Sequence, residues 1–193
     1  MKLVMVLLLA SLCAGAQSSY KDSANNYIKR YITNHELIKG TDKQYLQFYE
    51  ANPDFRVVSH FEKVENSNWF KMEATGTLRQ LYRIYGRIHF NIHDTAVTLT
   101  IYQSQSLMQN DQYKDYLFIP FADASCGFAS YEGGRYIDIR TGDIENDVLV
   151  IDFNKAYNPY CAYEGKYNCP IPPKENRIAV AILAGEKKFG KSH

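Results

Sequence analysis

Two aspartates in apolar surroundings are the side chains best suited to acid–base chemistry. Asp138 lies within Tyr-Ile-Asp-Ile-Arg, and Asp152 lies within Val-Ile-Asp-Phe-Asn. A carboxylate drawn toward an apolar core costs free energy unless it is paired or hydrogen-bonded. If the role is structural, the candidate partners are Arg135, Arg140 and Arg177. Alternatively both carboxylates meet in a cleft as acid–base or metal-binding groups. The polar residues that could join them there are Asn154, Glu175 and Glu186.

The segment from Phe153 to Arg177 follows neither a helical nor a strand period and is rich in Tyr, Asn, Pro and Cys. An irregular stretch of this length in a compact domain is usually functional or disordered, and its rings and prolines disfavour disorder. We expect an ordered loop over one end of a β scaffold, whose asparagine side chains satisfy its backbone. Aromatic rings beside amides and a carboxylate also suit a polar-ligand pocket. The predicted binding residues are Arg135, Asn154, Tyr157, Asn158, Tyr163 and Asn176.

Familiar catalytic and metal-binding motifs do not occur in the sequence. There is no Gly-x-Ser-x-Gly, Cys-x-x-Cys or His-Glu-x-x-His. His89 and His93 would share a face of a helix, but on a strand they lie roughly 13 Å apart, too far for one ion. We therefore predict no metal site and assign no cofactor. Gly133-Gly134 precedes a strand, so we expect a tight turn that places Arg135 beside an acid.

Three cysteines remain when the N-terminal leader is set aside: Cys126, Cys161 and Cys169. An odd number leaves at least one thiol outside any intramolecular pair. Cys161 and Cys169 are close together within one irregular loop, so we predict a disulfide between them that is worth about 2.5 kcal/mol. Cys126, within Ala-Ser-Cys-Gly-Phe, is typical of a small buried residue.

Residues 1–16 have the form of a secretory signal peptide. Lys2 precedes an apolar run that ends at Leu12 and is too short to span a membrane. Ala14-Gly15-Ala16 is the pattern that signal peptidase cuts. We expect export to the periplasm or beyond, with no transmembrane segment. A lipoprotein anchored through Cys13 is the less favoured alternative, because Leu12 stands where lipid attachment prefers a small residue.

Composition indicates one globular domain over residues 17–193. The chain is 46% hydrophobic and 22% charged, which lies within the globular range. A net charge of +1 creates no overall field that would favour nucleic acid or an anionic membrane as partner. The sequence has 16 Tyr and 10 Phe but one Trp. Tyrosine suits strand faces and cleft walls, because its ring is apolar and its hydroxyl needs a partner.

Hydrophobic periodicity predicts a helical arm over about residues 20–50. Tyr27, Tyr31 and His35 recur four residues apart, which places them on one helix face. A second short helix is expected over Asp42–Glu50, before Asn52-Pro53.

From about residue 55 to 186 the period changes to two, which indicates strands. The clearest element is a hairpin, in which the strands Tyr82–Ile92 and Val97–Tyr102 are joined by a turn at His93-Asp94-Thr95. One face of this hairpin is polar and should be exposed to solvent. Pro120 indicates that its strand lies at an edge of the sheet or contains a bulge. Val148–Phe153 and Ile178–Ala184 are apolar on both faces and should be centrally buried strands. The other expected strands are about 55–62, Trp69–Thr77, Tyr116–Phe121, Arg135–Arg140, Val148–Phe153 and Ile178–Ala184, the last two being the doubly apolar ones. The fold class is mainly β, an antiparallel sandwich or barrel of about eight strands.

The sequence resembles the DUF1684 family of uncharacterised bacterial and archaeal proteins. The resemblance covers nearly all of residues 17–193 and is tightest between Tyr82 and Glu186. The matching stretches are Tyr85-Gly86, Leu117–Asp123, Gly133–Asp138, Asp152–Pro159, Cys161–Tyr163, Cys169–Pro173, Glu175-Asn176 and Ala184–Glu186. The family pattern includes both loop cysteines and omits Cys126. Resemblance to this family implies no activity, cofactor or partner.

We favour an exported β-barrel or sandwich module that binds a small polar ligand through the 153–177 loop and adjacent strands. One alternative is a hydrolase-type enzyme. In that case Asp138 or Asp152 would be the general base or a metal ligand, and Glu175 the acid. The other alternative is a structural or interaction protein of the cell envelope, with the loop as the partner surface.

Overall fold

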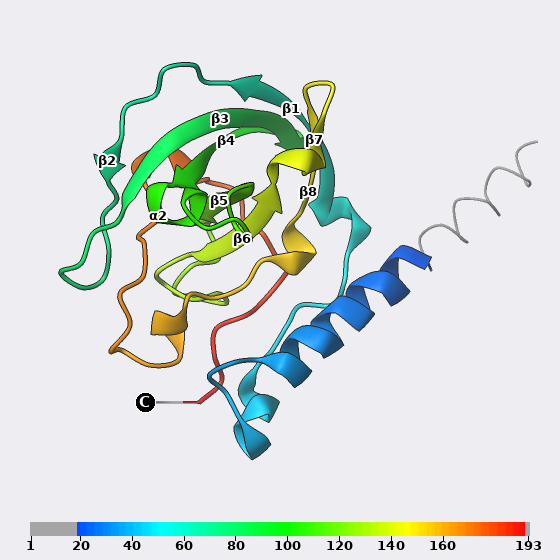
Figure 1. The fold of residues 1–193 in the computed structure, drawn as a ribbon. Helices are drawn as coiled ribbons and strands as arrows, with labels where there is room; N and C mark the ends of the chain where they lie inside the picture. The colour runs from blue at the N-terminus through cyan, green and yellow to red at the C-terminus, as the bar shows by residue number, and fades with distance from the viewer. Residues whose placement is uncertain (1–18, 192–193) are drawn as a thin grey trace, which may run out of the picture.

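The computed structural model describes residues 19–191, in which eight strands form one antiparallel sheet that curls into a half-barrel (Figure 1). The predicted signal peptide and the alternative anchor at Cys13 lie outside the described residues. A mainly β, antiparallel fold is therefore confirmed. The described strands all join one sheet, so the curled sheet and not a two-sheet sandwich is the correct form of the prediction.

The strands are β1 (Arg56–Lys63), β2 (Phe70–Lys71), β3 (Leu81–Ile92), β4 (Thr95–Ser104), β5 (Tyr116–Phe121), β6 (Arg135–Arg140), β7 (Ile144–Glu145) and β8 (Val148–Asp152). Helical turns are α2 (Gln105–Met108) and the 3-10 segments Gly40–Tyr45, Pro53–Phe55, Thr141–Asp143, Phe153–Lys155, Tyr160–Ala162 and Lys174–Asn176. A longer helix covers residues 19–34. The strand order is β6-β5-β4-β3-β1-β8-β7, and β2 pairs with β3 beside this path.

The predicted hairpin is confirmed as β3 and β4. Ile88 pairs with Leu99 in the antiparallel register, and both side chains are buried in the core. His93 takes a positive φ of 50° in the two-residue turn. The register shifts between Ile84 and Gly86, and a Cβ on Gly86 would lie 2.3 Å from the ring of Phe61. This irregularity bends β3 and lets the sheet curl closely over β1.

Pro120 lies where β5 separates from β4. The two strands pair only at Tyr102 and Phe118 among the described residues. Beyond that point the amide of Asn176 fills the gap, because its Oδ1 accepts the N–H of Thr100 at 2.7 Å. Its Nδ2 donates to the carbonyls of Thr100 and Pro120 at 2.9 and 2.7 Å. Although Pro120 pairs with Tyr136 of β6 on its other side, toward β4 it faces a side-chain amide and not a strand, so its missing N–H breaks no ladder bond.

The half-barrel ends at β6 on one side and at β8 with the short β7 on the other. The expectation that Val148–Phe153 is buried on both faces is wrong for the outer face of β8. Val148 and Val150 are 40% and 37% exposed, whereas Leu149 and Ile151 are in the core. The physical reason is position, because β8 lies next to the edge of the sheet and no segment within residues 19–191 covers its outer side chains fully.

The expected strand at Ile178–Ala184 does not form. Its first residues bond to the chain after β5, with Ile178 N–H donating to Ala122 O and Val180 O accepting from Ala124 N–H. Its later residues bond instead to side chains of a buried ion pair. The guanidinium of Arg135 donates to the carbonyls of Ile182, Ala184 and Glu186, and the N–H of Ile182 donates to Asp123 Oδ1. The segment is apolar because it crosses the core, not because it lies within the sheet.

Two other expected elements are shorter than predicted. Gly40–Tyr45 is a 3-10 turn in place of a helix over Asp42–Glu50, since the following backbone bonds to the C-terminal segment; Tyr49 N–H, for example, donates to Gly185 O. In the Trp69–Thr77 stretch only Phe70–Lys71 is a strand, because Thr75 N–H donates to Cys169 O of the disulfide loop.

The helix at residues 19–34 runs beside the open side of the half-barrel (Figure 1). Tyrosine hydroxyls attach it to the C-terminal part of the chain. Tyr20 donates to Asp152 at 2.8 Å, and Tyr31 donates to Glu186 at 3.2 Å. The predicted helix face is therefore the docked face, and it carries phenols where a usual amphipathic helix carries aliphatic side chains.

Candidate functional site

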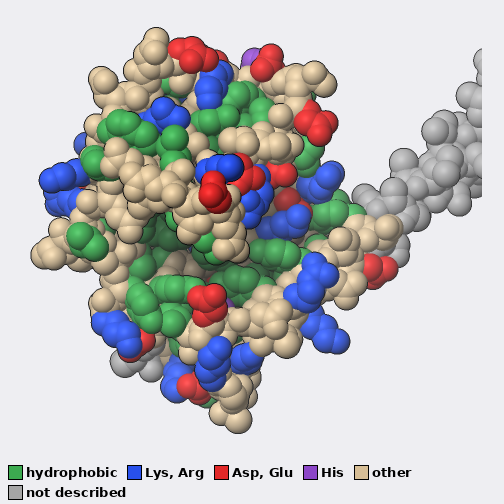
Figure 2. Space-filling view, in the orientation of Figure 1, with side chains coloured by type: hydrophobic (Ala, Val, Ile, Leu, Met, Phe, Trp, Pro, Cys, Tyr) green, Lys and Arg blue, Asp and Glu red, His purple; other side chains and the backbone are tan. Residues whose placement is uncertain are grey.

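A cavity of about 580 Å³ lies between the two ends of the curled sheet. Figure 2 shows a hollow between the N-terminal helix and the sheet, with hydrophobic side chains inside it and acidic and basic side chains on its rim. β6, β8, the turn before β7, the helix and the 153–177 loop all contribute to its lining. The lining residues are Tyr27, Tyr116, Ile137, Asp138, Ile139, Gly142, Asp143, Glu145, Val150, Asp152, Lys155 and Tyr157.

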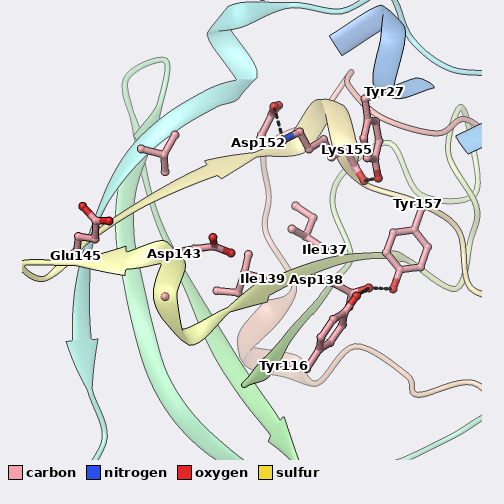
Figure 3. A pocket seen from close by; sticks show the side chains of 12 residues that line it. Tyr27, Tyr116, Ile137, Asp138, Ile139, Asp143, Glu145, Asp152, Lys155 and Tyr157 are labelled. Carbon is pink, nitrogen blue, oxygen red and sulfur yellow. Dashed lines mark hydrogen bonds and ion pairs between the residues drawn. The ribbon is translucent and has the colours of Figure 1, made fainter. Parts of the chain in front are cut away.

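Asp138 projects into this cavity from β6, between two isoleucines that face the core. Strand alternation places it on the opposite face from Ile137 and Ile139. Its Oδ2 accepts hydrogen bonds from Tyr157 Oη at 2.6 Å and from Tyr116 Oη at 3.4 Å (Figure 3). Burial raises the pKa of Asp138 to about 6, although both hydroxyls lower it by stabilising the carboxylate. The partners of Asp138 are thus tyrosines and not the arginines that the sequence offered.

Asp152 borders the same cavity from the end of β8 and is 9% exposed. Its Oδ1 caps the 3-10 segment Phe153–Lys155 by accepting from Asn154 N–H at 3.1 Å, and it also accepts from Tyr20 Oη. Its Oδ2 lies 3.9 Å from Lys155 Nζ. Figure 3 shows this pair on the side of the cavity away from Asp138 and Tyr157. Asp152 therefore fixes the local backbone and at the same time contributes charge to the cavity.

The cavity continues along the N-terminal helix. A neighbouring cavity of about 340 Å³ shares Tyr27, Asp138 and Tyr157 and extends to His35 and Tyr160. Burial raises the pKa of Tyr27 to about 12 and that of Tyr157 well above its usual value. Both phenols therefore keep their protons at neutral pH and can donate hydrogen bonds. Together the two cavities form one groove with tyrosines on both walls.

The groove carries an excess of negative charge. Four carboxylates border the larger cavity: Asp138, Asp143, Glu145 and Asp152. Among the residues that the structure describes, Lys155 is its one cationic lining residue, and the Lys155 ammonium lies 5.7 Å from the centroid of the Tyr27 ring. Carboxylates and tyrosine faces both attract cations and sugar-like or amide donors. With a pKa near 6, Asp138 can also hold or release a proton close to neutral pH.

Of the predicted binding residues, Tyr157 alone lines the larger cavity, together with the candidate acids Asp138 and Asp152. The others are almost fully buried and hold the fold together: Arg135, Asn154, Asn158, Tyr163 and Asn176. Asn154, for example, donates to Asn52 O at 2.8 Å, which joins the loop to the segment before β1. The third candidate acid, Glu175, lies elsewhere and accepts from Tyr102 Oη at 2.8 Å.

Sequence reasoning missed much of the wall: Tyr27, Tyr116, Asp143, Glu145 and Lys155. Tyr27 belongs to the predicted helix face, so its spacing was a usable signal for a buried position. Nothing local marks Tyr116 or Glu145, because their role depends on which strands form the two ends of the sheet. His89 is remote from the groove, on the outer face of β3, with its Nε2 3.2 Å from Glu62.

Glu186 is a second buried carboxyl, placed beneath the N-terminal helix. It accepts from Asn158 N–H at 2.8 Å and from Tyr163 Oη at 2.7 Å, in addition to Tyr31. Burial raises the pKa of Glu186 to about 7, against the lowering effect of these donors. It is enclosed by the fold and does not line the larger cavity.

The predicted disulfide between Cys161 and Cys169 is confirmed, and the two Cα atoms lie 6.2 Å apart. The Thr75 hydroxyl lies 3.1 Å from Cys161 Sγ and accepts from Cys169 N–H at 3.0 Å, so the bridge also fixes the segment after β2. Cys126 is free and partly buried, and burial raises the pKa of its thiol. Among residues 19–191, no cluster of three or more His, Cys, Asp or Glu is arranged to hold a metal. In the same range no helix has the length and apolar character to cross a membrane.

The comparisons with known proteins give a family and a fold. The family described as "Protein of unknown function (DUF1684)" matches residues 43–187. The solution NMR structure of an uncharacterized protein from Haloarcula marismortui matches with a TM-score of 0.62 and 24% identity, over 97% of each chain. At that identity the similarity shows the fold alone, and no curated protein matches the chain. Because the family match covers most of its length, the chain belongs to the DUF1684 family.

Proposed function

We propose that this protein is an exported binding module that holds a small polar ligand in the groove between β6, β8 and the N-terminal helix. One observation carries the proposal. Asp138 and Asp152, from the two ends of the sheet, border one cavity of about 580 Å³ whose walls include three tyrosines. A preformed concave site with a few convergent polar groups is the usual form of a small-ligand site.

The polar groups are fixed before any ligand arrives. Tyr157 is held on β6 by two backbone bonds to Tyr136, at 2.9 and 3.0 Å. Its hydroxyl then positions Asp138 through Oδ2, whereas Asp138 Oδ1 accepts no hydrogen bond from residues 19–191. A carboxylate oxygen that is oriented but open is suited to a ligand donor. Preorganisation of this kind lowers the entropic cost of binding.

Export is part of the proposal. The N-terminal leader supports it, as does the Cys161–Cys169 disulfide, because disulfides persist in oxidising compartments outside the cytosol. Detection of the processed protein in the periplasmic or secreted fraction, with an N-terminus at Gln17, would support this part. Exclusive recovery from the cytosol with the leader intact would exclude it.

A ligand screen tests the binding function. Purified protein is heated with sugars, amines, short peptides, nucleotides and metal ions, and the melting temperature is recorded. A ligand at a hundred times its Kd stabilises by about 2.7 kcal/mol, which is readily visible. We expect stabilisation that Asp138→Asn and Tyr157→Phe reduce and that Glu175→Gln, outside the groove, leaves unchanged. The proposal would be refuted if no compound raised the melting temperature, or if a compound raised it equally in the unmodified protein and in both groove variants.

A hydrolase-type enzyme is the second candidate, favoured by the raised pKa of Asp138 and by Asp152 in the same cavity. Asp138 would transfer the proton, and the remote Glu175 would have no part. A panel of ester, amide and glycoside substrates tests this candidate. Turnover that is lost in Asp138→Asn and kept in Glu175→Gln would favour it over simple binding.

A further inference from the structure

The outer edge of β6 is unpaired at Asp138. β5 and β6 pair in unbroken register, so alternate residues of β6 direct their backbone N–H and C=O away from β5. Tyr136 is one of these, because both of its groups bond to Tyr157. Asp138, two residues further on, must also face outward. Within residues 19–191, neither its N–H nor its C=O has a backbone partner there.

The opposite end of the sheet is unpaired at Val150. The carbonyl of Asp147 accepts from Phe61 N–H of β1, so odd-numbered residues of β8 bond to β1 and even-numbered ones face away. β7 pairs with Val148 and Leu149 and extends no further along β8. Val150 is the next outward residue and, in the described part of the chain, meets no further strand. Its side chain borders the same cavity as Asp138.

The loop itself shows what the β6 edge accepts. Tyr157 forms an antiparallel bridge with Tyr136. An uninterrupted strand would continue by placing residue 155 opposite Asp138. Residues Phe153–Lys155 instead form a 3-10 segment, so the chain turns away from the edge before that position. The edge position at Asp138 is left open to another backbone, which is the arrangement that β-strand addition uses.

The charge of the cavity indicates which side chain such a backbone would carry. Carboxylates outnumber cations on its lining by four to one, namely Asp138, Asp143, Glu145 and Asp152 against Lys155. The Lys155 ammonium already lies between the Asp152 carboxylate, at 3.9 Å, and the Tyr27 ring, at 5.7 Å. The same combination of carboxylate and phenol would accept a ligand's lysine or arginine.

We propose, building on the function proposed above, that the ligand is a short extended peptide. Its backbone forms an antiparallel bridge with Asp138 on the edge of β6. A neighbouring lysine or arginine side chain enters the acidic part of the cavity. The bridge supplies affinity for any peptide backbone, and the carboxylates supply the preference for a basic side chain.

The test uses defined probes and the ¹⁵N-labelled protein. The parent probe is acetyl-Ala-Lys-Ala-amide. Two further probes carry a backbone N-methyl group, one on Lys and one on the following Ala, and a fourth has Gln in place of Lys. Butylammonium represents the side chain alone. Dissociation constants are measured by titration, and the backbone amides of Asp138 and Val150 are followed by NMR.

We expect the parent peptide to shift the Asp138 amide and to slow its hydrogen exchange. Only alternate peptide N–H groups pair with a strand edge, so one of the two N-methyl probes should bind at least about fivefold more weakly than the parent and the other should bind as the parent does. The Asp138→Asn variant should bind the Lys peptide about tenfold more weakly and the Gln peptide unchanged. Glu175→Gln, outside the groove, should bind both as before.

The outcomes separate this inference from the proposed function. Equal binding of butylammonium and the parent peptide, or of both N-methyl probes and the parent, overturns recognition of a peptide backbone. Failure of every peptide, together with stabilisation by some other polar compound, overturns the peptide and leaves the binding function standing. Failure of every probe and of the wider ligand screen overturns both.

Discussion

The guanidinium of Arg135 lies 2.7 Å from the carboxylate of Asp123, and both side chains are wholly shielded from solvent. The pair joins the start of β6 to the loop after β5. The same two side chains bond to the backbone of the C-terminal segment, through the carbonyl of Ile182 at 2.8 Å and its N–H at 3.0 Å. One ion pair therefore fixes three segments that are far apart in sequence.

Removal of Asp123 should destabilise the fold severely. Asp123→Ala leaves the buried guanidinium without its counter-charge, and we expect a loss of about 3–5 kcal/mol in the free energy of unfolding. Urea denaturation followed by tyrosine fluorescence or circular dichroism measures it. Asp115→Ala, which removes the exposed partner of Arg140, is the matched control and should cost under about 1 kcal/mol. Equal losses in the two variants would contradict the role of the buried pair.

The Asn176 amide should not be replaceable by a carboxylate. Asn176→Asp keeps the shape but cannot donate to the carbonyls of Thr100 and Pro120. We expect a cost of about 2–3 kcal/mol at pH 7, again from urea denaturation. Asn110→Asp serves as control, because Asn110 is exposed and its side chain, within the described part of the chain, only accepts from Gln112 N–H through Oδ1. The assignment fails if both substitutions cost the same.

Loss of the Tyr157 hydroxyl should raise the pKa of Asp138. A hydrogen bond to the carboxylate favours the ionised form, so Tyr157→Phe should move the pKa upward from about 6. Tyr116→Phe should act in the same direction but less, because its contact is 3.4 Å against 2.6 Å. A ¹³C NMR titration of the aspartate carboxyl measures both. A downward shift in Tyr157→Phe would be incompatible with the hydrogen-bonded arrangement.

The buried carboxyl of Glu186 should make stability depend on pH. Burial raises its pKa from 4.5 to about 7, so the folded protein retains a proton that the unfolded chain releases. The stabilising contribution is complete below about pH 4.5 and is lost as the pH rises through about 7. Relative to Glu186→Gln, the unmodified chain should lose roughly 3 kcal/mol across this interval.

Urea unfolding at half-unit steps between pH 4.5 and 8 measures that difference. The comparison with Glu186→Gln removes the contributions of other titrating groups, His35 among them, because both proteins contain them. A difference between the unmodified chain and Glu186→Gln that stays constant with pH would refute the prediction.

The disulfide should contribute through the short loop that it closes. Cys169→Ser combined with Cys161→Ser should cost about 2.5 kcal/mol in the free energy of unfolding. Cys126→Ser keeps the bridge and should cost little, because its thiol is only partly buried. The same unfolding titration, repeated with and without reductant, measures both. Insensitivity of the unmodified protein to reductant under unfolding conditions would argue against a stabilising bridge.

Local pattern predicted the parts of the fold whose neighbours are close in sequence. The alternation around Ile88 and Leu99 is strict and a turn joins the two strands, so the hairpin follows directly. The stretch Ile178–Ala184 has the same apolar character, yet its later backbone groups bond to the side chains of Arg135 and Asp123, some 50 to 60 residues away. No periodicity reveals that side chains of a distant ion pair will replace a neighbouring strand.

The candidate site was predictable to a similar extent. Asp138 and Asp152 stood out because each interrupts an apolar strand, and the structure places both on one cavity. Their tyrosine partners did not stand out, because 16 tyrosines share one chemistry and sequence position does not show which will meet. The asparagines of the 153–177 loop were predicted to bind a ligand because they are polar. In the structure they are buried and hydrogen-bond to other segments of the fold, as Asn176 does to Thr100.

The hydrogen bond between Tyr31 and Glu186 joins residues 155 positions apart. Ribosomes release a chain from its N-terminus onward, so the first helix emerges long before the residues that anchor its phenols. Contacts between residues so far apart slow folding, because closing the long intervening stretch of chain costs entropy. The wall that completes the groove is thus the first of the described segments to be synthesised, and the bond that anchors it at Glu186 forms only after nearly the whole chain has been made.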